Sequence, residues 1–320
     1  MHDVASWRAA VCSRLWQLQA DGVGWGYGVS EPPYTEPTVL ACLALLASAD
    51  GTPSLETWEA VDACAEYLSR LQQSDGAVGV AAGIATPHWP TAYAALLWSQ
   101  IPGYDRPLAC ALRWLQQDGR AARYFSDEQI VDGDMRWWPD LPLRAAEARI
   151  IPASLAVLAL CRNQLAGHVR VQDGVRWILD SALPHGGWAA EGSLHTEGET
   201  YPQAAATGIA LLALRAANRD ESHVVTDACY CLARVLASTE SPAMFGWAWL
   251  GYHAWHSRTA ESWQWLSRVM QWPIARAEDP AGLAMLLLAG SPDALTLLGV
   301  SAATNASSCS PGLAQELLGI

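Results

Sequence analysis

Three acidic residues stand in segments rich in aromatic and hydroxyl side chains, and they are the groups best suited to proton chemistry. Glu36 lies in a Tyr-Thr-Glu-Pro-Thr segment, Glu261 follows a Thr-Ala pair, and Asp134 stands just before two tryptophans. A carboxyl group packed against aromatic rings loses hydration, which raises its pKa and keeps it protonated as a proton donor. We therefore take Glu36, Glu261 and Asp134 as the candidate catalytic acids.

The aromatic composition is skewed, with 17 tryptophans against two phenylalanines. Rings gathered at one mouth of a fold line an apolar pocket, and their π-faces attract carbocations and quaternary amines. Burial between helices is the alternative explanation, and we expect it for Trp25, Trp188 and Trp247. The candidate substrate-binding residues are Tyr27, Tyr34, His88, Trp89, Trp138, Tyr201, Tyr252, Trp255 and Trp263.

An acidic cluster runs from Asp127 to Asp134, in the longest segment between expected helices. Magnesium is commonly held by a couple of carboxylates together with phosphate oxygens. The cluster predicts a Mg²⁺ site at Asp132 and Asp134, and magnesium is the one cofactor that we consider. A solvated loop, or an altered copy of a repeated Asp-Gly-x-Trp motif, explains the same residues.

Four histidines form a further candidate group: His88, His195, His253 and His256. Imidazoles that meet at one end of a ring-shaped fold can bind a transition metal or relay protons. Histidines exposed in tryptophan-rich loops are the alternative interpretation.

The elements that must position these residues recur along the chain. A tryptophan- and glycine-rich loop, such as residues 19–27, is followed by a helix of small apolar residues with Thr or Pro at its head. Such repeats indicate an array or a closed ring of identical helical units. The expected heads are Thr35–Thr38, Trp89–Thr91, Ile151–Ala153, Ala205–Thr207 and Thr259–Glu261.

Two kinds of helix alternate between the loops. The segment Leu55–Gln72 has apolar residues on one face and charged residues on the other, whereas Leu155–Leu160 and Ile209–Leu214 are apolar all round. A double-walled ring requires both kinds of helix, because its inner helices are enclosed and its outer helices have one face in water. We predict an all-α fold, an α/α toroid of five to six helix pairs, with an open solenoid as the competing architecture.

The whole chain, residues 1–320, is expected to form one toroid domain whose last repeat is degenerate. Asp279–Leu288 predicts one more buried helix, which either closes the ring or covers its end. The segment from about residue 301 to residue 320 is rich in Ser, Asn and Ala at its start, and we expect it to be loose.

The Gln-x-Asp-Gly motif before Trp25 and the Glu36-Pro37-Thr38 head resemble the repeats of the prenyltransferase/squalene oxidase superfamily, which includes squalene-hopene cyclases, terpene cyclase β-domains and protein prenyltransferase β-subunits. The resemblance implies the toroid fold. It also implies that the loop motif is structural, so Gln19, Asp21 and Trp25 are expected to be scaffold.

The catalytic motifs of that superfamily are missing. Class II terpene cyclases carry an Asp-x-Asp-Asp-Thr-Ala motif at an inner-helix head, and no head here matches it; Glu36 is the single acid at such a position. Protein prenyltransferase β-subunits bind zinc through an Asp-x-Cys pair at the head of an inner helix. The same residue types occur here at Asp62–Cys64 and Asp227–Cys229, but in segments that we assign to the outer wall, so we do not expect them to bind zinc. Class II cyclases also pair this domain with a second helical domain, for which 320 residues leave no room.

Composition excludes several classes of function. The net charge of −13 argues against nucleic-acid binding, which needs clustered cations. All 19 cationic side chains are arginine, so lysine Schiff-base chemistry and a P-loop lysine are absent. The eight cysteines lack metal-site or disulfide spacing, and no apolar run reaches the length of a membrane span. We expect a cytoplasmic protein.

The leading functional hypothesis is a terpene cyclase-like enzyme, an isomerase or lyase that acts on an isoprenoid or similarly hydrophobic substrate in an aromatic central cavity. In this hypothesis, the reaction is started by a protein acid or with the help of a metal ion. The first alternative is a non-catalytic lipid-binding protein or partner subunit, with a homodimer left open. The second is a carbohydrate-active toroid enzyme, in which two carboxylates face each other.

Overall fold

The computed structural model describes residues 3–20, 22–49, 51–86, 88–117, 149–190, 202–219 and 222–302. These residues form helices joined by loops, and the described chain contains isolated β-bridges but no β-strand. The expected site residues Asp132, Asp134, Trp138 and Tyr201 lie outside the described residues, as does His195.

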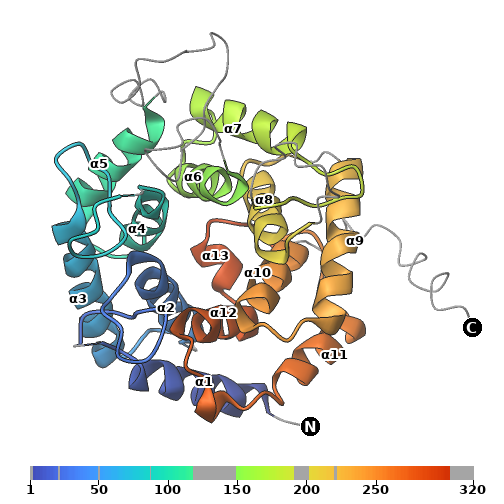
Figure 1. Cartoon of the computed structure of the whole chain (residues 1–320), viewed down its shortest axis with the longest axis horizontal. Helices are drawn as coiled ribbons and strands as arrows, with labels where there is room; N and C mark the ends of the chain where they lie inside the picture. The colour runs from blue at the N-terminus through green and yellow to red at the C-terminus, as the bar shows by residue number, and fades with distance from the viewer. Residues whose placement is uncertain are drawn as a thin grey trace, which may run out of the picture.

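The described helices form a double-walled ring, the α/α toroid that the sequence predicts (Figure 1). Each inner helix packs against the next one, and the last inner helix packs against the first, which closes the ring. The open solenoid is thereby excluded. The inner helices are α2 (Thr35–Ser48), α4 (Pro90–Trp98), α6 (Ile150–Arg162), α8 (Ala204–Ala216), α10 (Pro242–His253) and α12 (Pro280–Gly290).

The outer wall consists of amphipathic helices, each with one face on the inner ring. In α3, for example, Val61, Cys64 and Leu68 are fully buried, and the glutamates of the other face are exposed. The outer helices are α1 (Val4–Gln17), α3 (Leu55–Leu71), α5 (Asp105–Gln116), α7 (Val169–Asp180), α9 (Ser222–Ser238) and α11 (Ala260–Val269).

The tryptophan loops fasten outer helices to inner helices. The Trp25 indole donates a hydrogen bond to the carbonyl of Leu15 (2.8 Å), and its backbone N–H donates to Thr38 Oγ1 (3.0 Å). Trp188 repeats this arrangement, with the carbonyl of Ile178 at 2.7 Å and the Thr207 hydroxyl at 3.0 Å. Both tryptophans are fully buried, so Trp25 has the scaffold role that the sequence predicts.

The fifth expected helix head is wrong. Thr259 heads the outer helix α11, where it forms a capping box with Ser262, and the fifth inner helix begins earlier, at Pro242. The Gly-Trp-Ala-Trp sequence at 246–249, which resembles a repeat loop, lies inside this buried helix. A cap identifies a helix start but does not distinguish the inner wall from the outer wall.

Beyond α12, residues 291–302, which include the short helix α13 (Ala294–Leu297), fill one end of the central hole; we call this segment the plug (Figure 1). Side chains at the C-terminal ends of three inner helices hold it. Gln100 and Arg162 donate to the carbonyl of Leu297, and Arg215 donates to the carbonyl of Ser301. The buried helix expected at 279–288 is therefore confirmed as α12, and the chain after it covers one end of the ring.

None of the helices in the described ranges is long and apolar enough to cross a bilayer.

Candidate functional site

The ring has two different ends. Because the chain alternates between the walls, all inner helices begin at one end, the head end, and finish at the other, the plug end. Glu36 is in the first turn of α2, at the head end, whereas Glu261 is in the first turn of the outer helix α11, at the plug end. The two acids therefore cannot share one site at a single mouth.

The aromatic candidates divide in the same way. Tyr27, Tyr34 and Trp89 come from loops that lead into inner helices, so they lie at the head end; Tyr252, Trp255 and Trp263 lie at the plug end. The prediction that all of these rings gather at one mouth is wrong. The physical reason is the misassigned fifth head, which placed α11 in the inner wall.

At the head end, two tyrosine hydroxyls hold the Glu36 carboxyl group. Tyr27 Oη donates to Glu36 Oε2 (2.5 Å), and Tyr93 Oη donates to Oε1 (3.1 Å). Tyr93 belongs to the neighbouring inner helix α4 and is 1% exposed. Glu36 itself is half-buried.

Burial dominates the electrostatics of this site. It raises the pKa of Glu36 above its usual value of 4.5; the two tyrosine hydrogen bonds act against this rise, and the negative charge of Asp279 adds to it. The pKa values of Tyr27 and Tyr93 are also raised, first by burial and then by the adjacent Glu36. Both phenols therefore stay protonated at neutral pH and remain hydrogen-bond donors to the carboxyl group.

Each of the two tyrosines that hold Glu36 packs against a further aromatic ring. Tyr27 packs on Tyr34 with ring centroids 5.1 Å apart, and Trp89 meets the edge of Tyr93 at 5.7 Å. Tyr27 is 41% exposed, so part of this group reaches the surface. The head end thus combines a carboxylic acid of raised pKa with several π-faces.

Sequence reasoning missed Tyr93. The signal was present, since a tyrosine in the otherwise Ala- and Leu-rich stretch Pro90–Trp98 needs a partner for its buried hydroxyl. Asp279 was missed as well. An aspartate just before a helix is expected to be an N-cap, and Asp279 does accept a hydrogen bond from the backbone N–H of Gly282, so the sequence suggests no further role for it.

His88 lies at the head end but contacts the outer wall. Its ring meets Trp114 of α5 at 5.8 Å, and the nearby carboxylate is that of Asp75. Burial lowers the pKa of His88, so the ring is neutral at pH 7. Because His253 and His256 lie at the plug end, His88 does not meet them.

The plug-end candidates have structural partners. Trp255 donates to the carbonyl of Leu211 (3.1 Å) and lies under the Arg215 guanidinium (5.1 Å). Tyr252 stacks on His256, with ring centroids 4.5 Å apart. Glu261 is exposed, and Trp263 is 42% exposed. These residues do not form a cluster around Glu261 that resembles the one around Glu36.

Within the part of the chain that the structure describes, no group of three or more His, Cys, Asp or Glu residues is arranged to hold a metal ion. The Asp-x-Cys pairs at 62–64 and 227–229 lie on the outer helices α3 and α9, as the sequence predicts.

Solved structures share this fold. A protein from Actinoplanes superimposes with a TM-score of 0.63 at 16% identity, over 93% of this chain and 100% of that chain. The likeness establishes the fold. The type II terpene cyclase MstE from Scytonema has a TM-score of 0.60 at 14% identity, over 85% of this chain and 80% of its own. The α-1,6-mannanase GH76A from Salegentibacter has a TM-score of 0.64 at 10% identity, over 92% of this chain and 100% of its own.

No protein-family model matches the sequence, and no curated protein matches it. Two of the similar solved structures belong to enzymes of different kinds, a terpene cyclase and a mannanase. At identities of 14% and 10%, these similarities show the shared fold alone.

Proposed function

We propose that this protein is a terpene cyclase-like enzyme that acts on an isoprenoid or similarly hydrophobic substrate at the head end, with Glu36 as the acid. The observation that carries the proposal is the Glu36 site: a carboxyl group of raised pKa, held by the hydroxyls of two tyrosines, each of which packs on another aromatic ring. A proton donor beside π-faces is the combination that alkene protonation requires.

The reaction would begin with transfer of the Glu36 proton to an alkene carbon. The π electrons of the alkene form the new C–H bond, which leaves a carbocation on the adjacent carbon and a carboxylate on Glu36. Tyr27 and Tyr93 already donate to the two carboxyl oxygens and would stabilise that carboxylate. Attack by a second alkene closes a ring, and loss of a proton to solvent ends the sequence.

The similarity to MstE supports this proposal in one respect. It spans 80% of that cyclase chain, so one toroid of this size accounts for most of a type II terpene cyclase. The objection that 320 residues leave no room for a second helical domain therefore loses its force.

The proposal is tested by incubating the protein with geranylgeranyl diphosphate, squalene and oxidosqualene, with and without Mg²⁺, and analysing extracts by mass spectrometry. We expect a cyclised product from at least one substrate, and formation of that product is expected to be lost in Glu36→Gln. Substrate binding without product would instead support the non-catalytic lipid-binding alternative.

A second candidate, glycan hydrolysis, rests on a specific pair of carboxylates. Asp279 heads α12, which packs against α2, and its charge raises the pKa of Glu36. An acid of raised pKa beside a second carboxylate is the arrangement of a glycosidase, and the mannanase has this fold. Release of reducing sugar from an α-1,6-mannan, and its loss in Asp279→Asn, would favour this candidate over the cyclase.

A further inference from the structure

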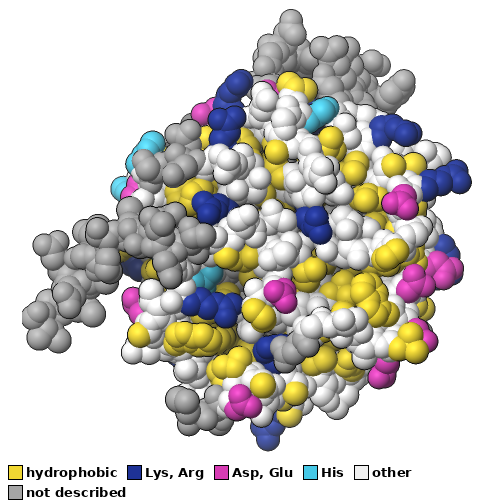
Figure 2. All heavy atoms as spheres, turned by 180° about the vertical axis from the view of Figure 1, so that it is seen from behind, with side chains coloured by type: hydrophobic (Ala, Val, Ile, Leu, Met, Phe, Trp, Pro, Cys, Tyr) yellow, Lys and Arg dark blue, Asp and Glu magenta, His cyan; other side chains and the backbone are white. Residues whose placement is uncertain are grey.

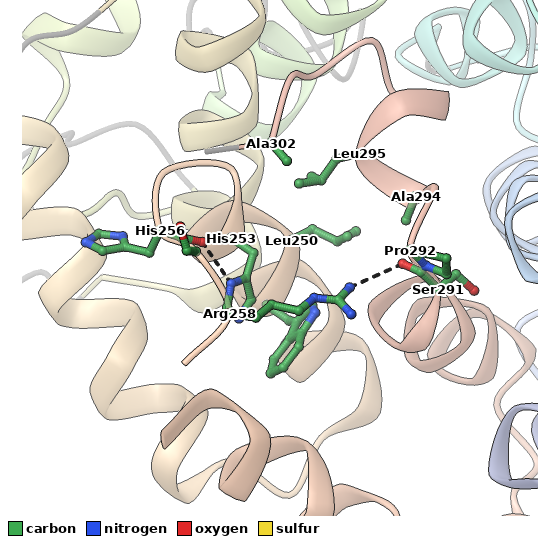
Figure 3. Close-up of a pocket in the computed structure, with 11 residues that line it drawn as sticks. Leu250, His253, His256, Arg258, Ser291, Pro292, Ala294, Leu295 and Ala302 are labelled. Carbon is green, nitrogen blue, oxygen red and sulfur yellow. Dashed lines mark hydrogen bonds between the residues drawn. The ribbon is translucent and has the colours of Figure 1, made fainter. Parts of the chain in front are cut away.

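A cavity lies at the plug end, at the opposite end of the ring from Glu36. It has a volume of about 260 Å³ and lies between the C-terminal part of α10 and the plug. Figure 3 shows His253 and Arg258 on the α10 side, with Ser291 and Leu295 contributed by the plug. The cavity is thus formed by α10 and the loop after it on one side and by the plug on the other, and two of its polar side chains, His253 and Arg258, can bind a ligand.

His253 presents an unused acceptor. The residue is 5% exposed, and its Nδ1 is 3.0 Å from the carbonyl oxygen of His256. A carbonyl can only accept, so Nδ1 carries the proton and Nε2 has the lone pair. Among the residues that the structure describes, the buried Nε2 has no hydrogen-bond partner. Burial lowers the pKa of His253 to about 4, so this neutral tautomer persists at pH 7.

Arg258 presents unused donors. Its guanidinium has five N–H groups, and within the described chain one of them reaches the carbonyl of Ser291, at 3.4 Å. The indoles of Trp249 and Trp263 each lie 5.8 Å from the guanidinium carbon. The residue as a whole is exposed, but partial burial of its guanidinium lowers the pKa of Arg258, and no acidic neighbour contributes to that shift. Arginine nevertheless stays charged at neutral pH, so a cation with further N–H donors lies beside the cavity.

The surroundings favour an anion at this end. The carbonyl groups at the C-termini of the inner helices carry partial negative charge, but Arg8, Arg162 and Arg215 already donate to carbonyls there. Figure 2, the view from behind, shows cationic side chains near the middle of that face and acidic ones mostly towards its edge. Arg258 is thus left to bind a ligand.

We propose that this cavity binds a small organic acid that also carries a hydroxyl group. The carboxylate accepts hydrogen bonds from Arg258, and the ligand hydroxyl donates to Nε2 of His253. The apolar body of the ligand packs against Trp249, Leu250 and Leu295. This site lies at the opposite end of the ring from Glu36, so it does not depend on the function proposed for the head end.

Isothermal titration of the full-length protein with three matched probes tests the chemistry. Phenyllactate has the acid, the hydroxyl and an apolar ring; phenylpropanoate lacks only the hydroxyl; methyl phenyllactate lacks only the charge. We expect phenyllactate to bind about tenfold more tightly than either of the other two, since each of them lacks one hydrogen-bonded group.

Two variants assign the contacts. Arg258→Gln removes the cation from an exposed position and is expected to weaken phenyllactate binding at least tenfold, whereas Arg113→Gln, an exposed arginine of α5, leaves binding unchanged. His253→Asn keeps a donor for the carbonyl of His256 and removes Nε2. It is expected to weaken phenyllactate binding to the level of phenylpropanoate without changing the affinity for phenylpropanoate.

Equal affinity of the wild-type protein for all three probes would overturn the proposal, as would full affinity in Arg258→Gln. Binding of inorganic phosphate but of no probe would contradict the ligand class. The probe comparison uses only the wild-type protein, so it decides the matter even where a variant fails to fold.

Discussion

Glu36 combines a raised pKa, two tyrosine donors and partial accessibility at the head of an inner helix. Its identity as a candidate acid could be predicted, because it is the single acid at the position where the resembling cyclases carry theirs. Its partner Tyr93 could not be paired with it from sequence, since 57 residues separate them and only ring packing brings α2 and α4 together.

The raised pKa of Glu36 predicts a pH dependence of stability. Between pH 4.5 and the raised pKa, the folded state binds a proton that the unfolded state has lost, so the free energy of unfolding falls as pH rises. Glu36→Gln removes this dependence. Urea titrations from pH 4 to pH 9 are therefore expected to show the wild type losing stability relative to the variant as pH rises.

Glu59→Gln, an exposed site on α3, serves as the control and is expected to follow the wild-type curve. A constant difference between the wild type and Glu36→Gln across this pH range would show that burial does not raise the pKa of Glu36.

At the scale of elements, the alternation of fully buried and amphipathic helices could be predicted from the sequence. For most helices, the sequence also predicted whether the helix belongs to the inner or the outer wall. The exception was α11, whose Thr259 cap imitates an inner head. What separates the walls is close packing: α8 and α10 approach so closely that Gly208 and Gly251 lie against each other. An N-cap residue depends only on local hydrogen bonds, so it does not predict how closely a helix packs against its neighbours.

Gly208→Ala tests this contact. A Cβ atom there would lie 2.2 Å from the carbonyl oxygen of Trp247, so α8 and α10 must separate. We expect a loss of at least about 2 kcal/mol in the free energy of unfolding, measured by urea denaturation. Gly167→Ala is the matched control, since an added Cβ meets nothing within 4 Å, and it is expected to stay within about 0.5 kcal/mol of the wild type. Equal stability of the two variants would contradict the close approach.

At the scale of the molecule, the repeats predict a ring but do not specify its closure or which end is open. Closure depends on contact between α12 and α2, which lie at opposite ends of the chain. The plug depends on hydrogen bonds from Arg162 and Arg215 to backbone carbonyls, which leave no sequence pattern. The sequence therefore did not predict that the plug covers one end of the toroid and not the other.

Ring closure predicts that damage at the α12–α2 seam reaches the far side. Leu286→Asp puts a charge at a fully buried position of α12, and we expect amide-exchange protection to fall in α6 as well as in α12. Leu55→Asp, at a 74% exposed position, is the control and should change neither. Full protection of α6 in Leu286→Asp would indicate an array of independent units instead of one closed ring.

The most direct test of the central claim is to follow the proton. Any prenyl substrate that the protein converts is incubated in D₂O, and the deuterium content of the product is measured by mass spectrometry. Acid initiation by Glu36 predicts one deuterium at the carbon that is protonated first, and at least about a 100-fold lower rate in Glu36→Gln. A product without deuterium, or an unchanged rate in Glu36→Gln, would contradict the account.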